Sequence, residues 1–286
     1  METVQTWPAG LIAAGSVSDS WLVRWRSLRR WLGPVVSFEG RVATRVTTIL
    51  RAGHPRDDFA AVGAVKLLLI AVPDERLPDA MDGLLAQPVD WPGLHVVLCD
   101  SQHDVTALAP LTERGAATAT ICQFHEMDAA RLLAEGQGRA LALVRRYLEG
   151  SRLQLVEVDP GAKSLFLAAT HMLGLSFPLL AASMELMRRA GFSAEMASKL
   201  MERTLHRQAH SARAGRKGLS GPLAGGRRDA IEHHLRAMES ASPQIKHYYV
   251  ESAIQALEFL SVNPELREEL LELRRPPPQA RAAVRG

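Results

Sequence analysis

The chain has 286 residues, of which 47% are hydrophobic and 23% charged, and its formal net charge is +3. This composition is typical of a soluble globular protein of about two domains, and the small net charge gives no case for a nucleic-acid partner. Cys99 and Cys122 are too few for a disulfide framework, and the N-terminus lacks the basic and apolar regions of a signal peptide. We therefore expect a cytoplasmic protein.

Short apolar runs alternate with helical patterns over the first half of the chain. Residues 9–14 predict a strand, 15–18 a turn, and the residues from Asp19 an amphipathic helix with Trp21, Trp25 and Leu28 inward and arginines outward. A membrane-surface or nucleic-acid helix is the alternative for this segment. Gly33-Pro34 ends that helix in our interpretation. Further strands are predicted at 35–38, 66–72, 95–99, 118–122 and 153–158, and helices at 41–50, 76–86, 104–114 and in parts of 129–149.

The run 66–74, Lys-Leu-Leu-Leu-Ile-Ala-Val-Pro-Asp, is the clearest strand signal. Both sets of alternating side chains are apolar, as in a strand that is buried on both faces of a parallel sheet. Ligands of open parallel sheets bind just beyond the carboxyl ends of such strands. Val72, Pro73 and Asp74 are therefore candidate cofactor contacts.

Strands that alternate with helices at these spacings predict an α/β fold, with a doubly wound parallel sheet covered by helices on both faces. The composition changes at Asp159-Pro160-Gly161, and no convincing strand follows. Helices are predicted at 161–190, 193–213, 227–240, 243–262 and 264–274. We predict a nucleotide-binding domain at 9–159, a helical domain at 160–275 and a disordered tail at 276–286, which is rich in Pro, Ala and Arg.

The segment 164–184 contains no Asp, Glu, Lys or Arg and is long enough to span a bilayer. It also contains His171, Pro178 and several hydroxyl side chains, and it lacks aromatic belts at its ends. We favour a helix buried in the helical domain or in a dimer core, with a membrane span as the alternative.

The turn after the first strand is a candidate phosphate site, because a strand, a tight turn and a helix N-terminus present free amide protons to a pyrophosphate. The Gly-x-Gly-x-x-Gly fingerprint falls on Ala13, Gly15 and Ser18, so only the middle glycine is kept. An ordinary strand–helix turn is the alternative. The candidate contacts with the cofactor are Ala14, Gly15, Ser16 and Val17.

Ribose recognition is expected at the end of the second strand. Ser37, Arg41 and Arg45 lie there, and arginines suit the 2′-phosphate of NADP, whereas a carboxylate would favour NAD. We predict NADP rather than NAD. A solvated helix face is the alternative reading of these arginines.

Residues suited to acid–base chemistry are few. Lys163 opens the long apolar helix directly after the domain junction, where it could protonate or orient a carbonyl oxygen, or simply reach for water. His206 and His210 have metal-ligand spacing but lack a nearby third ligand, so we predict no metal site.

Three segments resemble a known family: 69–74 (Leu-Ile-Ala-Val-Pro-Asp), 108–116 and 221–226 (Gly-Pro-Leu-Ala-Gly-Gly). The family consists of bacterial proteins with a Rossmann-like N-terminal domain and a helical C-terminal domain of unknown function. It is similar to pyrroline-5-carboxylate reductases and to the 6-phosphogluconate and 3-hydroxyisobutyrate dehydrogenases. The resemblance implies NADP binding, a homodimer built by a helical domain like that of 6-phosphogluconate dehydrogenase, and a reaction cleft between the domains.

The resemblance carries over at Gly15, at Val72-Pro73-Asp74 and at Lys163. It departs at Cys122-Gln123, where relatives have His-Pro, and at Phe166-Leu167, where they have Tyr-His. One hypothesis is therefore an NADP-dependent reductase of a small carbonyl or imine, in which Lys163 is the proton donor or orienter and Ser101 contacts cofactor or substrate. The other is a non-catalytic dimer that keeps the fold and binds a nucleotide as a sensor or scaffold.

Overall fold

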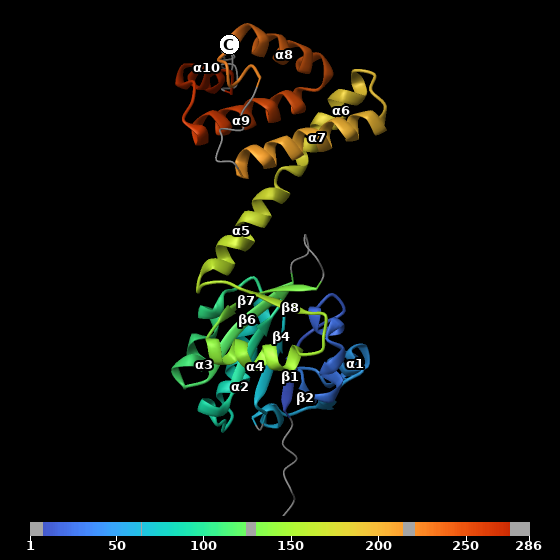
Figure 1. The fold of residues 1–286 in the computed structure, drawn as a ribbon, viewed down its shortest axis with the longest axis vertical. Coiled ribbons are helices and arrows are strands. Elements are labelled where there is room, and N and C mark those ends of the chain that lie inside the picture. Colours follow the sequence, from blue (N-terminus) through green and yellow to red (C-terminus); the bar gives the residue numbers. More distant parts are fainter. Residues whose placement is uncertain (1–7, 64, 124–129, 214–220, 275–286) are drawn as a thin grey trace, which may run out of the picture. The chain divides into compact units, whose positions relative to one another are not determined.

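The structure is a computed structural model that describes residues 8–63, 65–123, 130–213 and 221–274 (Figure 1). Contacts within the chain divide it into two compact units, residues 1–171 and 172–286. The domain boundary predicted between residues 159 and 160 remains a prediction. The tail that we expect to be disordered, 276–286, lies outside the described residues.

The first unit is built on a sheet of eight strands in the order β3-β2-β1-β4-β5-β6-β7-β8 (Figure 1). The strands β1 to β6 pair with one another in parallel, as predicted for all of them except β3, which was not predicted as a strand. The strand β7 runs antiparallel to β6, and β8 is parallel to β7. The sheet is therefore mixed rather than wholly parallel. The strands are β1 Ala9–Ala13, β2 Leu32–Val36, β3 His54–Arg56, β4 Leu67–Ala71, β5 His95–Cys99, β6 Ala117–Gln123, β7 Arg131–Gly136 and β8 Gln154–Glu157.

The burial predicted for β4 is confirmed, because Leu67 to Ile70 are fully buried. Leu67 and Leu69 join a core cluster with α1 and α4, whereas Leu68 and Ile70 join a second cluster with α2 and α3. Each such side chain contributes about 2 kcal/mol to the free energy of unfolding. The helices that cover the sheet are α1 Gly40–Leu50, α2 Leu77–Leu85, α3 Ala109–Glu113 and α4 Gly138–Leu148.

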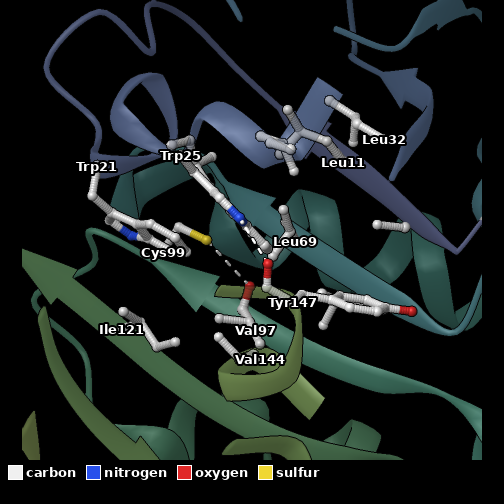
Figure 2. Packing of buried hydrophobic residues seen from close by; sticks show 14 of the residues in the cluster. Leu11, Trp21, Trp25, Leu32, Leu69, Val97, Cys99, Ile121, Val144 and Tyr147 are labelled. Atoms are coloured by element: carbon white, nitrogen blue, oxygen red, sulfur yellow. Dashed lines mark hydrogen bonds between the residues drawn. The ribbon is translucent and has the colours of Figure 1, made fainter. Parts of the chain in front are cut away.

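The α-helix predicted from Asp19 is absent. Two 3-10 helices, η1 Trp21–Arg24 and η2 Arg26–Arg30, occupy this segment and meet at Trp25. The indole of Trp25 is buried, stacks on Trp21 at 5.5 Å between ring centroids, and donates a hydrogen bond of 3.2 Å to the Tyr147 carbonyl oxygen of α4 (Figure 2). The inward orientation of the two tryptophans was predicted correctly. Their spacing of four residues does not come from an α-helix, because the two 3-10 helices are separated at Trp25, whose indole is bonded to α4. Both tryptophans belong to the core, which removes the membrane-surface interpretation of this segment.

Two other boundaries differ from prediction. Gly33 and Pro34 do not end a helix but lie inside β2. The segment 129–149, predicted to be helical in parts, contains the strand β7 before α4 begins at Gly138. Glu135 interrupts the apolar run of β7 and makes the segment look less like a buried strand in the sequence.

The second half of the chain is helical, as predicted. The expected helix at 161–190 is two helices, because residues 175–176 form a turn and Pro178 lies in the first turn of α6. A core cluster joins α8, α9 and α10 through apolar residues such as Leu235, Ile254 and Leu270. The helices are α5 Ala162–Gly174, α6 Phe177–Arg189, α7 Ala194–Arg213, α8 Arg228–Ala241, α9 Pro243–Leu260 and α10 Pro264–Arg274.

The apolar segment at the start of this half is not buried within the chain, contrary to one of our two expectations for it. Leu173 is 74% exposed and Phe177 is 71% exposed. Among the helices that the structure describes, the stretch Ala162–Arg189 is long and apolar enough to cross a membrane by length and composition alone. The other expectation, burial in a dimer core, needs a second copy of the chain.

Candidate functional site at the carboxyl edge of the sheet

The turn after β1 presents open backbone beside the end of β4. The Ala14 amide donates a hydrogen bond of 3.3 Å to the Ala71 carbonyl oxygen, which fixes the start of the turn. Gly15 has φ +85°, and a Cβ at this residue would meet no heavy atom within 4 Å. The hydroxyls of Ser16 and Ser18 lie 2.8 Å apart on the exposed side, whereas Val17 is buried. The turn therefore leaves room for a ligand, although no α-helix N-terminus follows it.

The ends of β4 and β5 are joined through Asp74. Its carboxylate accepts hydrogen bonds from the Ser101 hydroxyl at 2.6 Å and from the Gln102 amide at 3.1 Å. The predicted contacts Val72, Pro73 and Asp74 thus lie at one edge with the predicted Ser101. Ser101 is 2% exposed, so its hydroxyl makes hydrogen bonds within the loop and does not face solvent.

Lys163 is fully buried at the start of α5. Its ammonium group donates to the carbonyl oxygens of Ser101 at 2.8 Å and His103 at 2.6 Å, and to the Thr120 hydroxyl at 2.6 Å. All three ammonium protons thus have acceptors within the protein. Burial lowers the pKa of Lys163, and the nearby Cys122, Glu135 and Asp74 act in the opposite direction.

Sequence reasoning missed Glu135, the buried carboxylate of this network. Its two oxygens accept hydrogen bonds from the backbone amides of Lys163 at 3.0 Å and Val105 at 3.2 Å. It therefore ties the start of α5 to the loop after β5. The signal in the sequence was one acidic residue at the end of the apolar run in 131–136.

His103 is a second residue that the sequence reasoning missed. Its backbone is held on both sides, because its amide donates to the Ser101 hydroxyl at 3.0 Å and its carbonyl oxygen accepts from Lys163. Its side chain is exposed at the same edge. The network of Lys163, Ser101 and Asp74 thus fixes the backbone of a residue with an accessible imidazole.

The residues predicted to bind a 2′-phosphate follow β2. Ser37 is buried, and its hydroxyl accepts a hydrogen bond from the Glu39 amide. Arg41 and Arg45 are exposed one turn apart on α1, and neither side chain has a hydrogen bond or ion pair with the described part of the chain. The guanidinium of Arg76, just after the β4 end, lies 4.5 Å from the ring centroid of Phe38. This contact links the ends of β2 and β4.

Two family models match the chain. Residues 37–123 match a Rossmann-like domain, and residues 131–256 match a domain of unknown function, DUF2520. The two matched regions follow one another along the chain and leave residues 1–36 and 257–286 unmatched. The DUF2520 match begins at the first residue of β7, so it includes Glu135, Lys163 and the two last strands of the sheet.

Solved structures of similar fold cover almost the whole chain. An imine reductase from Streptomyces aurantiacus has a TM-score of 0.62 at 13% identity and covers 94% of this chain and 100% of its own. An imine reductase from Aspergillus terreus in complex with NADPH4 has a TM-score of 0.59 at 17% identity, and a reductive aminase from the same organism in complex with NADPH has 0.54 at 17%; both cover 94% of this chain and 92% of their own. No curated protein matches the chain.

Proposed function

We propose that the chain is an NADP-dependent oxidoreductase that reduces a small carbonyl or imine substrate. The observation that carries this proposal is the edge itself: the open turn at Gly15 lies beside the end of β4, and the buried network of Asp74, Ser101 and Lys163 builds the next loop. Proteins of the same fold include imine reductases and a reductive aminase in complex with NADPH. Ligands of doubly wound sheets bind at this edge.

The cofactor would lie across the turn and the strand ends. Backbone amides of Gly15 to Val17 and the hydroxyls of Ser16 and Ser18 would hold the pyrophosphate. The 3-10 segment that follows supplies no α-helix dipole for this purpose. Arg41 and Arg45 would bind the 2′-phosphate, because exposed arginines without carboxylate partners suit a dianion. NAD, without that phosphate, would bind less tightly.

Lys163 and Ser101 act as positioning residues in this proposal. The three protons of the Lys163 ammonium already have acceptors, so the geometry supports the orienting role over proton donation. We assign the proton donor to His103, whose imidazole is exposed at the loop that Lys163 organises. An imidazole can deliver a proton to a carbonyl oxygen or an imine nitrogen.

A homodimer is part of the proposal. Large exposed apolar patches mark interfaces, and a second copy would cover the patch on α5 and α6. The residues that make up this patch lie at the end of α5, the start of α6 and the turn between them: Met172, Leu173, Leu175 and Phe177.

Titration with NADPH and NADH, followed by cofactor oxidation with a panel of small imines and ketones, tests the function. NADPH should stabilise the chain against heat, because a ligand that binds only the native state raises its stability. His103→Ala should reduce kcat by about 100-fold and leave the Kd for NADPH unchanged, whereas His54→Ala, at the far edge strand β3, should change neither.

The alternative is a non-catalytic dimer that binds a nucleotide. Departures from the family at Cys122 and Phe166 favour it, because a buried thiol and an apolar ring stand where relatives have histidine and tyrosine. NADPH binding without turnover of any imine or ketone would support this alternative. Failure of both cofactors to bind at millimolar concentration would exclude both versions.

A further inference from the structure

A cavity of about 560 Å³ lies where the 3-10 segments after β1 meet the loop between α4 and β8. Three arginines from these two distant parts of the chain line it, and none of the described residues that line it is acidic. Val23, Arg24, Arg26 and Ser27 form one wall, and Ala130, Gly150, Ser151, Arg152 and Leu153 form the other.

The first wall is anchored by the residue between its two arginines. The indole N–H of Trp25 donates to the Ser27 hydroxyl at 2.9 Å and to the Tyr147 carbonyl oxygen at 3.2 Å. Figure 2 shows this indole directed from the 3-10 segment toward the end of α4. Trp25 is 1% exposed. The backbone that carries Arg24 and Arg26 is therefore fixed against the end of α4. The second wall follows directly after this helix.

The second wall is a tight turn that follows α4. Gly150 has φ +76°, and the Ser151 amide donates to the Leu148 carbonyl oxygen at 2.8 Å. The Leu153 amide donates to the Ser151 hydroxyl at 3.2 Å, and Leu153 is buried. Arg152 lies between these two fixed residues. Hydrogen bonds within the chain thus hold both walls, which lowers the entropic cost of binding a ligand.

Two of the three arginines that line this cavity, Arg26 and Arg152, have side chains without a partner in the described chain. Neither side chain makes a hydrogen bond or ion pair with any described residue. Guanidinium groups that face one cavity repel each other unless an anion lies between them, and their planar N–H forks match phosphate oxygens. The volume falls within the roughly 300–1,000 Å³ of small-molecule sites.

We propose that this cavity is a binding site for a phosphorylated small molecule, held through its phosphate by Arg26 and Arg152. None of the described residues that line it is among the proposed cofactor contacts, and it lies on the face of the sheet opposite Lys163. Trp25 belongs to the core cluster on one face of the sheet, together with Ala134. The next residue of the same strand, Glu135, faces the opposite side, where it holds Lys163.

The test is calorimetric titration of the full chain with inorganic pyrophosphate, with and without saturating NADPH. Wild type should bind pyrophosphate under both conditions, and the double variant Arg26→Ala/Arg152→Ala should bind it about tenfold more weakly or worse. The matched control is Arg41→Ala/Arg45→Ala, which removes two exposed arginines from the proposed cofactor site. It should keep pyrophosphate binding and weaken NADPH instead.

Four results would overturn this site: no pyrophosphate binding by wild type, loss of that binding in the α1 variant alone, competition by NADPH, or equal binding of succinate, which would show a site for carboxylates. The site and the proposed function fail separately. Pyrophosphate binding that depends on Arg26 and Arg152 in a chain that ignores NADPH would support the site and count against the oxidoreductase. Arg26 and Arg152 are exposed, so their replacement by alanine should leave the melting temperature unchanged. Measuring it checks that the double variant folds.

Discussion

The carbonyl oxygen of Ser101 accepts a hydrogen bond of 2.8 Å from the ammonium group of Lys163, although 62 residues separate them in the chain. This contact joins the loop after β5 to the start of α5. Its partners on the same ammonium group are the His103 carbonyl oxygen and the Thr120 hydroxyl. Three elements of the first unit therefore depend on one buried cation.

Lys163→Met should destabilise the first unit by about 3 kcal/mol, because it leaves buried acceptors without a donor and Glu135 without its nearby cation. Urea unfolding followed by tryptophan fluorescence measures this, since all five tryptophans of the chain lie within residues 1–171. Lys66→Met is the control, because Lys66 is exposed and should change stability by less than about 0.5 kcal/mol. Equal effects of the two variants would contradict the role assigned to Lys163.

The stacked indoles of Trp21 and Trp25 differ in one property. Trp25 donates two hydrogen bonds through its indole N–H, whereas the buried indole N–H of Trp21 has no partner among the described residues. Trp25→Phe should therefore cost about 1–2 kcal/mol more than Trp21→Phe, because only the first leaves a buried carbonyl oxygen unpaired. Both substitutions remove similar volume, so their difference in urea unfolding isolates the hydrogen bonds. A larger cost for Trp21→Phe would refute this account.

Gly15→Ala should cost about 1 kcal/mol, because an L-residue at φ +85° is strained although its Cβ meets no neighbour. Gly15→Asn should cost less, since asparagine tolerates this conformation. Gly136→Ala provides the contrast: φ is +148° there, and the added Cβ would lie 2.5 Å from the Ala119 Cα. Thermal unfolding should rank Gly136→Ala far below Gly15→Ala in stability, and the reverse order would show that the turn at Gly15 is not open.

The Asp104 carboxylate contributes to the free energy of unfolding of the first unit, and this contribution is lost at acid pH. Hydrogen bonds from the side chain and amide of Thr106, and then from Ser164, hold the pKa of the Asp104 carboxyl below its usual 3.8. A depressed pKa in the folded state means that the stabilisation is present above 3.8 and is lost as the pH falls through the folded value. Wild type should thus be more stable than Asp104→Asn at about pH 7 and should lose that advantage below about pH 4. A pH-independent difference between the two unfolding curves would exclude this linkage.

The apolar patch on α5 and α6 predicts the oligomeric state. Leu173→Glu/Phe177→Glu should convert the proposed dimer into a monomer, because two charges would be buried at the interface. Light scattering after gel filtration measures the mass. Leu273→Glu, at another exposed leucine on α10, should leave the dimer intact. A wild-type chain that is monomeric, or that requires detergent, would contradict the proposed dimer.

Five of the first six strands and the helical second half could be predicted from the sequence, because apolar runs such as 67–71 and the break at Pro160 are local signals. The strand β3 could not, because its three residues are exposed and form no apolar run. The direction of β7 could not. Strand direction depends on where the chain returns, and nothing within Arg131–Gly136 encodes it. The missing helix after β1 was also hidden, since the spacing of Trp21 and Trp25 fits an α-helix and the anchor at Tyr147 lies 122 residues away.

The candidate site was predictable in part. Gly15, Val72, Asp74 and Ser101 follow predicted strands, and parallel strands bring their ends together. The surroundings of Lys163 could not be predicted, because its acceptors are mostly backbone carbonyl oxygens, which every residue has. Glu135 was missed for a similar reason. A single carboxylate in a strand does not indicate a site by itself, and its partners are backbone amides that the sequence does not reveal.

Glu135 also fixes how β7 aligns with β6. Its registered partner on β6 is Thr120, and both side chains are fully buried on one face of the sheet. Because strand side chains alternate between faces, a slip of β7 by one residue would move the Glu135 carboxylate into the apolar cluster around Trp25 and separate it from the Val105 and Lys163 amides. The misaligned sheet would bury an unpaired charge. The carboxylate that builds the site therefore also selects a single alignment of the only antiparallel strand pair in the described part of the sheet.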